Sequence, residues 1–481
     1  MRLQVVFRYI GMVLLFESAF MLLSALISYH NGIDSGFTPL LLSFLFTALL
    51  GSFPLIFVGK SSRLSSKESY AIVIGAWLTS CVVGMFPYLL WGGEFSVINA
   101  WFECVSGFTS TGASILNDVE ALPKGLLFWR SITNWIGGVG VVMFALVIMP
   151  MVGSSRMNVS NLEISSMARD NYRYSSSTII KILLGVYLGM TIANVIALRL
   201  AGMGLFDSVC HAFSTISTGG FSTKNASIGY YNSVWIEGIT IFFMLLSSIH
   251  LGITYATFMG RKNNIFHTEG SRFFLAVTLF LCLIASINLW NSGTYDSFGS
   301  SLRHGIFQGV SIVTSTGFAT ADTNLWPSLC ICILVYMSIQ GGMAGSTAGG
   351  LKSDRILMAY KVIKAQLRQQ QHPSAVIRIK NDGITQNPSV VNFAILYIVI
   401  YAFILLLGTI VNSACGLDTL TSFTASVASM GNIGPGFGDV GSMSNFSQMP
   451  ILVKFVSTLQ MLLGRLEIFG LLHFFSMKWW I

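Results

Sequence analysis

The sequence predicts an all-α integral membrane protein with four pseudo-symmetric copies of a helix, a re-entrant pore loop and a second helix, preceded by two extra N-terminal helices. Of its 481 residues, 53% are hydrophobic and 10% are charged, whereas soluble proteins carry about 25% charged residues. A short phrase ending in glycine also returns four times, at intervals of about 100 residues, which is typical of repeated structural units. Composition therefore places most of the chain in a bilayer, and the repeats divide it into equivalent units.

Ten segments are apolar enough to span a bilayer, which takes about 20 residues of helix. They are 5–28, 38–58, 70–91, 124–151, 178–201, 233–259, 271–290, 325–362, 390–413 and 450–474. No small-residue cleavage pattern follows the first of them, so we expect no cleaved signal peptide.

Four shorter helical segments fall between pairs of these spans, and each ends at one of the glycine phrases. They are 96–109, 206–217, 300–314 and 418–431. Each is too short to cross, and non-helical backbone at membrane depth is tolerated only where it is buried or lines a water-filled cavity. The pattern therefore predicts re-entrant loops.

Spans and loops together divide the chain into five expected units. They are 1–68 with the two N-terminal helices, 69–151 as pore repeat 1, 152–260 as pore repeat 2, 261–380 as pore repeat 3 with an intramembrane gating loop, and 381–481 as pore repeat 4.

Loop charges predict the orientation of the spans. One set of loops is basic, at 60–67, 156–181, 261–272 and 352–380, and the opposite set is acidic. Because Lys and Arg collect in cytoplasmic loops, we expect the basic set and both termini in the cytoplasm, with the re-entrant loops entering from outside. The net charge of +8 is then a consequence of topology and does not indicate binding to nucleic acid.

The four glycine phrases are predicted to form a selectivity filter for a monovalent cation. The C-terminal end of each preceding helix carries about half a negative charge, and glycine lets extended chain turn its carbonyls toward an axis. One such phrase alone would indicate a turn, whereas four in equivalent places favour a filter. No acidic ring accompanies them, as a divalent filter would require. The filter residues are Ser110, Thr111, Gly112, Ser217, Thr218, Gly219, Ser315, Thr316, Gly317, Asn432, Ile433 and Gly434.

A glycine-rich segment interrupts the eighth span. Five glycines in ten residues cannot form a stable helix interior, and no Gly-Lys-Ser/Thr follows that would make a phosphate-binding loop. Two interpretations are open, a packing face against a neighbouring helix or a flexible loop that crosses the pore below the filter as a gate. The residues concerned are Gly341, Gly342, Gly345, Ser346, Thr347, Gly349, Gly350 and Lys352.

Arg465 lies in the last span. A charge at membrane depth costs roughly 2.5–3.5 kcal/mol even on lenient scales, so the side chain must face the interior, a cavity or a partner. We expect it to project into the pore as part of the gate. The alternative is a local ion pair with Glu467, although residues two apart on a helix do not face each other.

Other ionisable residues in apolar segments carry weaker signals. Glu103, on the first short helix, is expected either to accept backbone hydrogen bonds near the filter or to be plainly structural. The scattered residues Glu17, Glu237, His211, His250 and His304 favour structural hydrogen bonding over a proton relay. The seven cysteines have no metal-like spacing and are expected to be small packing residues.

The chain resembles the TrkH family, the membrane subunits of bacterial Trk potassium-uptake systems in the wider Trk/Ktr superfamily. The matching stretches are 102–113, 216–223, 314–318, 345–352, 431–436 and 464–467. The two extra N-terminal spans favour the Trk branch. Relatives with serine at the first filter glycine are sodium-permeable, so Gly112 favours potassium. Ile433 departs from the hydroxyl residue of the other copies, and its side chain should point away from the pore.

The resemblance implies potassium uptake across the bacterial inner membrane, with K⁺ as the substrate ion at the filter residues. It implies a homodimer with one pore in each protomer, and a cytosolic TrkA-like ring of regulatory subunits. The nucleotide is then bound by that partner and not by this chain, which needs no covalent cofactor. It also assigns the glycine-rich loop and Arg465 to the intramembrane barrier.

Two alternatives remain. A symporter that couples K⁺ entry to H⁺ or Na⁺ would have the same filter, because coupling depends on alternating gates. A membrane-embedded enzyme would need a nucleophile, a base or a metal cluster, and the sequence indicates none, so we expect no enzymatic activity.

Overall fold

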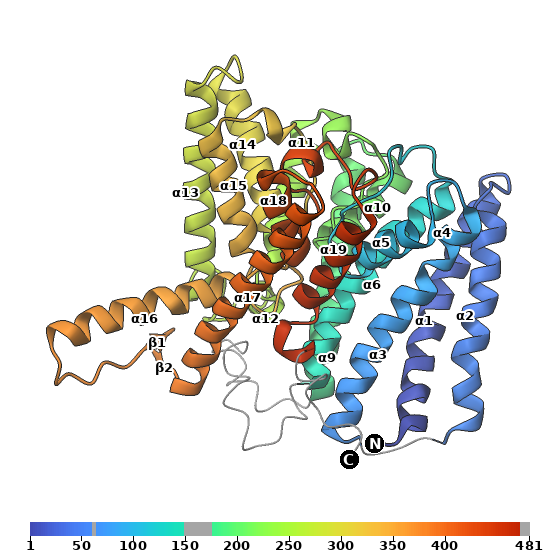
Figure 1. Cartoon of the computed structure of the whole chain (residues 1–481), viewed down its shortest axis with the longest axis horizontal. Coiled ribbons are helices and arrows are strands. Elements are labelled where there is room, and N and C mark those ends of the chain that lie inside the picture. Colours follow the sequence, from blue (N-terminus) through green and yellow to red (C-terminus); the bar gives the residue numbers. More distant parts are fainter. Residues whose placement is uncertain (60–63, 149–175, 472–481) are drawn as a thin grey trace.

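The computed structural model describes residues 1–59, 64–148 and 176–471. The ends of the expected spans 124–151 and 450–474, and most of the basic segment 156–181, lie outside these ranges. The described residues form one largely helical bundle (Figure 1). The helices of its first half are α1 (Leu3–His30), α2 (Phe37–Phe57), α3 (Ser66–Gly84), α4 (Phe86–Trp91), α5 (Val97–Phe108), α6 (Lys124–Ile148), α9 (Ser176–Leu200), α10 (Leu205–Ile216), η3 (Ser227–Tyr231), α11 (Val234–Ser248) and α12 (Leu251–Phe258).

The second half continues in the same style. Its elements are α13 (Glu269–Asn291), α14 (Phe298–Val313), η4 (Thr323–Leu325), α15 (Ser328–Gln340), α16 (Ser353–Gln371), β1 (Lys380–Asn381), β2 (Ile384–Thr385), α17 (Pro388–Ala414), α18 (Thr419–Met430), η5 (Gly438–Val440) and α19 (Ile451–Arg465).

Among the described residues, six helical stretches are long and apolar enough to cross a membrane. They are Leu3–His30, Phe37–Phe57, Lys67–Trp91, Lys181–Leu200, Glu269–Asn291 and Pro388–Ala414. All six coincide with expected spans, while the full set of ten stays a prediction.

The expected span 233–259 consists of two helices, α11 and α12, and whether it crosses as one span stays a prediction. α11 and α12 are bent by 112° at residues 249–250. The imidazole Nδ1 of His250 accepts a hydrogen bond from the N–H of Gly252 at 2.9 Å and so begins a new helix. The N–H of Leu251 donates to the carbonyl of Gly345 at 3.2 Å. The bend therefore follows from a capping side chain and from a contact with the glycine-rich segment.

The four short helices lie within two residues of their predicted bounds. These are α5, α10, α14 and α18. Three begin at side chains that accept hydrogen bonds from the first-turn N–H groups, namely Ser96, Ser297 and Asp418. Polar capping residues therefore set the point at which each of these helices turns into the bundle.

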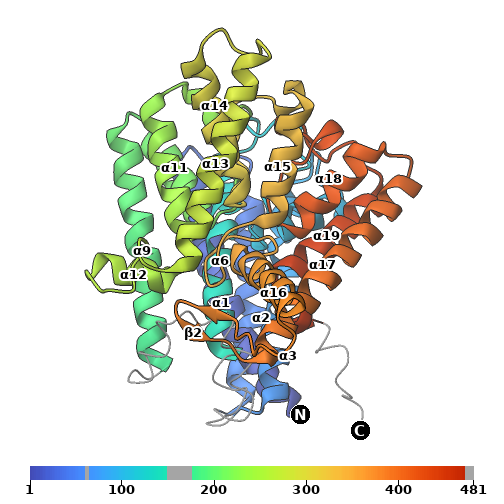
Figure 2. The ribbon, with the colours of Figure 1, turned by 90° about the vertical axis from the view of Figure 1, so that its left-hand side faces the viewer.

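The short helices are joined through the longer helices that follow them. The helix after each short helix also packs on the next short helix: α6 on α10, α11 on α14 and α15 on α18. α19 packs on α5, which returns to the beginning of the series (Figure 1). The neighbouring pair α15 and α18 is seen in Figure 2. The ends of all four short helices are thereby brought around one centre.

Two further features lie outside this ring. α1 and α2 cross closely where Gly11 and Gly51 face each other, since a Cβ atom on Gly11 would lie 2.6 Å from the carbonyl oxygen of Gly51. α16 extends sideways from the bundle and ends in the small antiparallel pair β1–β2 (Figure 1). The ammonium of Lys361 on α16 pairs with the carboxylate of Glu269 on α13, which fixes the base of this arm.

Candidate functional site

The chain leaves each short helix through the same backbone conformation. The first residue beyond the helix cap has a positive φ of 50–54°, and the residue two positions later is a glycine with a positive φ of 71–99°. The N–H of the residue between these two donates a hydrogen bond to the carbonyl oxygen five residues earlier in the chain, at 2.8–2.9 Å. The three positions are Ser110, Thr111 and Gly112; Thr218, Gly219 and Gly220; Ser315, Thr316 and Gly317; and Asn432, Ile433 and Gly434.

The register expected in the second copy is therefore one residue early. Ser217 occupies the helix-capping position that Thr109 and Thr314 occupy elsewhere, and its Oγ donates to the carbonyl of Phe213 at 2.7 Å, as Thr109 does to Val105. Gly220 takes the place of Gly112. The phrase Ser-Thr-Gly hid this shift because Thr218-Gly219 is followed by a second glycine.

The four positive-φ glycines form a closed ring. A Cβ atom on Gly112 would lie 2.1 Å from the carbonyl oxygen of Gly219, and one on Gly220 would lie 2.0 Å from that of Thr316. A Cβ atom on Gly317 would lie 2.0 Å from the carbonyl oxygen of Ile433, and one on Gly434 would lie 2.7 Å from that of Thr111, which closes the series. Each glycine thus lies directly against a carbonyl of the next copy, and no side chain fits between them.

The ring opens on one side into a cavity of about 190 Å³. All four ring glycines line this cavity, together with polar groups that include Arg130 and Asn117. Beside it, the amide of Asn225 donates to the carboxylate of Asp118 at 2.7 Å, and this hydrogen bond lowers the pKa of Asp118. The hydrogen bond therefore keeps this carboxylate ionised to a lower pH than an ordinary aspartate.

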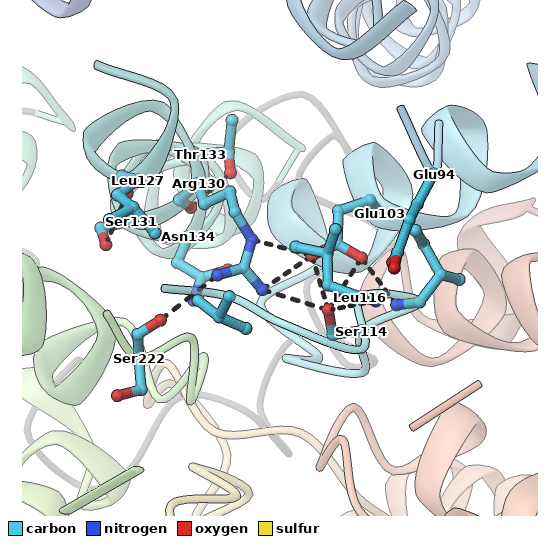
Figure 3. A network of polar contacts seen from close by, with 12 residues as sticks. Glu94, Glu103, Ser114, Leu116, Leu127, Arg130, Ser131, Thr133, Asn134 and Ser222 are labelled. Carbon is cyan, nitrogen blue, oxygen red and sulfur yellow. Dashed lines mark hydrogen bonds and ion pairs between the residues drawn. The ribbon is translucent and has the colours of Figure 1, made fainter. Parts of the chain in front are cut away.

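Glu103 and Arg130 form a buried ion pair at 2.7 Å beside the first copy (Figure 3). The Glu103 carboxylate also accepts hydrogen bonds from the N–H of Ile115 at 2.9 Å and the hydroxyl of Ser114 at 3.0 Å. Of the two alternatives for Glu103, the structure therefore shows the backbone contact. Arg130 was not predicted as a site residue, although an arginine inside an apolar span is a usable signal.

The other copies hold the chain beyond their glycines with different side chains. His211 lies seven residues before Thr218, and Gln308 lies seven residues before Ser315. Glu103 has the same position relative to Ser110. The Nε2 of His211 lies 3.0 Å from the Oγ of Ser222, and the amide of Gln308 donates to the carbonyl of Ala321 at 2.7 Å. In the fourth copy the hydroxyl of Thr424 donates to the carbonyl of Phe437 at 3.1 Å.

Two of the remaining titratable residues have structural partners, whereas neither buried carboxyl oxygen of Glu17 has a hydrogen-bond partner among the described residues. Glu237 pairs with Arg303 at 2.7 Å, and the Nδ1 of His304 lies 3.2 Å from the hydroxyl of Thr320. The described residues contain no group of three His, Cys, Asp or Glu side chains that could hold a metal ion. These contacts agree with structural hydrogen bonding.

Asn432 and Ile433 fit the fourth copy into the ring. The amide of Asn432 donates to the hydroxyl of Thr111 at 3.0 Å and to the carbonyl of Met461 at 2.9 Å. The side chain of Ile433 is buried and lies against Gly431, at the end of its own short helix. It therefore packs behind the ring.

The glycine-rich segment lies against the helix ends on the other side of the ring from the cavity. The N–H of Gly349 donates to the Oγ of Ser315 at 2.6 Å, and the hydroxyl of Thr347 donates to the carbonyl of Ile216 at 3.0 Å. A Cβ atom on Gly349 would lie 2.1 Å from the carbonyl oxygen of Gly431. Three of the four copies are thus contacted by this one segment.

The other members of this segment stabilise its path. Gly341, Gly345 and Gly350 have positive φ values of 66–81°, which explains their residue type. Gly342 has no space for a side chain beside Ala348, and the Oγ of Ser346 donates to the carbonyl of Met343 at 2.6 Å. The ammonium of Lys352 donates to the carbonyl of Ala348.

Arg465 completes the contacts beneath the ring. Its Nη1 donates to the carbonyl of Thr347 at 2.6 Å, and its Nη2 donates to the Oγ of Ser110, in the first copy, at 3.0 Å. The side chain is buried, and no salt bridge among the described residues involves it. The alternative of a pair with Glu467 is wrong, because Glu467 pairs with Arg355 at 2.6 Å.

Arg465 has no cationic counterpart in the other copies. Counted from the first residue of the helix that follows each short helix, the equivalents of Gly464 are Gly137, Ser247 and Gly341, all small. The equivalents of Arg465 itself are Gly138, Ser248 and Gly342. One guanidinium therefore enters a space that the other three copies leave clear of charged side chains.

Comparisons with known proteins agree with one another. Residues 40–479 match the TrkH family, described as cation transport proteins. The chain is 33% identical to the Trk system potassium uptake protein TrkH of Salmonella typhimurium and 32% identical to that of Escherichia coli K12, with 100% of both chains covered in each case. Its fold matches the crystal structure of the potassium transporter TrkH from Vibrio parahaemolyticus with a TM-score of 0.90, at 32% identity and full coverage of both chains.

Proposed function

Since the chain belongs to the TrkH family of cation transport proteins, we propose that it carries K⁺ across the cell membrane through a pore whose filter is the glycine ring. The observation that supports this most directly is the closure of the ring, in which four glycines meet the carbonyls of Thr111, Gly219, Thr316 and Ile433. Backbone carbonyls around one axis replace the hydration shell of a monovalent cation. The C-terminal ends of four short helices add favourable potential at the same place.

The segment 341–352 and Arg465 form the gate in this proposal. Together they contact all four copies on the side away from the cavity, where an ion leaving the filter would pass. A positive charge there repels a cation, and the hydrogen bonds of Arg465 to Thr347 and Ser110 hold the charge in place. Opening requires the segment to leave this position.

The proposal extends to assembly and topology. The positive-inside rule places the N-terminus and the basic arm from α16 to β2 in the cytoplasm of a bacterial cell. The arm projects beyond the bundle (Figure 1) and is a suitable docking surface for a cytosolic nucleotide-binding ring. A homodimer in the inner membrane, with one pore in each protomer, completes the arrangement, and the nucleotide stays with the partner.

Coupled symport of K⁺ with H⁺ is the second candidate. Glu17 favours it, because this carboxyl is only 1% exposed in the middle of α1 and an ionisable group at membrane depth is costly unless it serves a function. Tracer flux that follows a K⁺ gradient without any movement of protons would exclude symport.

The test of the proposed function is uptake of rubidium tracer into liposomes that contain only this protein. Added K⁺ should block uptake far better than added Na⁺. Equal block by both ions would refute the assignment of the ring as a K⁺ filter. If the intact protein is closed, Arg465→Ala serves for the same comparison.

A further inference from the structure

Arg130 lies at the junction between the first and second copies and lines the outer cavity. Its side chain, on α6, is 2% exposed. Burying a guanidinium is costly unless its donors are satisfied. The contacts that satisfy it show what it holds in place.

On one side, Arg130 holds the chain that follows Gly112. Its Nε donates to the Glu103 carboxylate at 2.8 Å, and its Nη2 pairs with the same carboxylate at 2.7 Å and reaches the hydroxyl of Ser114 at 3.3 Å (Figure 3). The carboxylate in turn accepts from the N–H of Ile115. The segment immediately after the first ring glycine is thus fixed to a rigid ion pair.

On the other side, Arg130 holds the chain that follows Gly220. Its Nη1 donates to the carbonyl of Ser222 at 3.3 Å, and its guanidinium lies 4.1 Å from the centre of the Phe221 ring. A planar guanidinium can stack on an aromatic ring and bond in its own plane at once, whereas an ammonium cannot. One side chain therefore ties two adjacent filter segments together.

At the other junctions, neutral contacts join the stretches of chain that follow the ring glycines in the described part of the chain, and charged pairs between copies, such as Arg303 with Glu237, join helices instead. Between the second and third copies, the N–H of Gly229 donates to the carbonyl of Ala319 at 3.0 Å. Between the third and fourth, the amide of Asn324 donates to the carbonyl of Gly438 at 2.9 Å. Between the fourth and first, the N–H of Phe446 donates to the carbonyl of Ser114 at 2.8 Å.

We propose that Arg130 is a positioning residue for ion selectivity, which holds the first and second filter segments at the fixed spacing that suits K⁺. This rests on the proposed function of the ring. An oxygen ring that is braced from outside resists contraction onto the smaller Na⁺ ion, so the brace contributes to the preference without touching the ion.

The experiment compares Arg130→Lys with wild type in rubidium uptake by liposomes, competed with K⁺ and with Na⁺. Lysine keeps the charge opposite Glu103 but cannot also reach Ser222 and stack on Phe221. We expect the preference for K⁺ over Na⁺ to fall about fivefold, the effect of losing roughly one net hydrogen bond from the K⁺-selective geometry. Phe221→Leu, which keeps the ion pair intact, should lower the preference in the same direction and serves if the lysine variant does not fold.

Arg303→Lys is the matched control. Arg303 pairs with Glu237 at 2.7 Å and also bonds Asn232 at 3.0 Å, and none of these residues lines the cavity beside the ring. Its substitution should leave the ion preference unchanged. If wild type does not distinguish K⁺ from Na⁺, the proposed function itself fails. If wild type is selective and Arg130→Lys lowers only the melting temperature, Arg130 is merely structural and the inference is overturned.

Discussion

Serine substitutions at the ring glycines should weaken selectivity, and most strongly where the structure leaves no room. At Gly220, φ is +71° and a Cβ atom would lie 2.0 Å from the carbonyl oxygen of Thr316. Real Cβ contacts essentially never fall below 3.0 Å, so the carbonyl oxygen of Thr316 must retreat by roughly 1 Å. Holding a non-glycine residue in such a conformation costs about 1–3 kcal/mol.

A cost of that size corresponds to about a 5- to 150-fold change in an equilibrium. If it falls on the K⁺-bound ring, Gly220→Ser should lower the preference for K⁺ over Na⁺ by at least about fivefold. Gly112→Ser should behave in the same way, since its Cβ atom would lie 2.1 Å from the carbonyl oxygen of Gly219. The assay is rubidium uptake into liposomes, competed with each ion in turn.

Gly219→Ser is the discriminating comparison. Gly219 has no positive φ, and the three atoms nearest to its Cβ atom would all belong to the side chain of Asn134, at 2.5–2.9 Å, rather than to a backbone carbonyl of the ring. We therefore expect a smaller loss of selectivity than at Gly220. A larger loss at Gly219 would refute the register that the backbone assigns to the second copy. Unchanged selectivity in Gly112→Ser would refute the ring as the filter.

Four further substitutions test the gate. Arg465→Ala should raise rubidium flux without any partner, because the buried charge beneath the ring is removed; equal or lower flux would contradict a barrier role. Gly349→Ala should also raise basal flux, since its Cβ atom would lie 2.1 Å from the carbonyl oxygen of Gly431. Gly345→Ala should raise it too, because Gly345 has a φ of +72° and its Cβ atom would lie 2.3 Å from the ring of His250; wild-type flux in both variants would favour a packing role for the segment. Arg355→Ala should raise basal flux by releasing Glu467, to which it is paired at 2.6 Å, and wild-type flux in this variant would show that the pair does not hold the gate closed.

The helical architecture and the place of the ring could be predicted from the sequence. Apolar length marks the long helices, and capping residues such as Ser96 and Asp418 mark the starts of short ones. Glycine marks the ring because positive φ and close backbone approach leave no alternative residue. These signals are local, and local signals can be recognised in a single sequence.

The register of the second copy could not be predicted in this way. Ser217-Thr218-Gly219 repeats the residue types of the first copy, yet the fold aligns Thr218 with Ser110 through the helix cap and the hydrogen bond from Gly219 to Ser214. The bend at residues 249–250 depends on the carbonyl of Gly345, nearly 100 residues later in the chain. Such features depend on tertiary contacts between distant parts of the chain, and these cannot be predicted from the residue types of a short segment.

The partners of buried charges were equally hidden. The sequence placed Glu467 beside Arg465, whereas the fold gives Glu467 to Arg355, which also lies 3.8 Å from the ring centre of Tyr397. Arg130 meets Glu103 from a different helix. Pairing of this kind follows from the packing of helices around the ring.

The single guanidinium beneath the ring has a consequence for how such a pore can be encoded. Four identical chains around one axis could supply either no arginine at this level or four, and four like charges in one small space would repel one another strongly. A chain that carries all four copies escapes this restriction, because Gly138, Ser248 and Gly342 stand where only the fourth copy has Arg465. Covalent linkage of the copies thus makes an odd number of charges possible at this level, as the proposed gate requires.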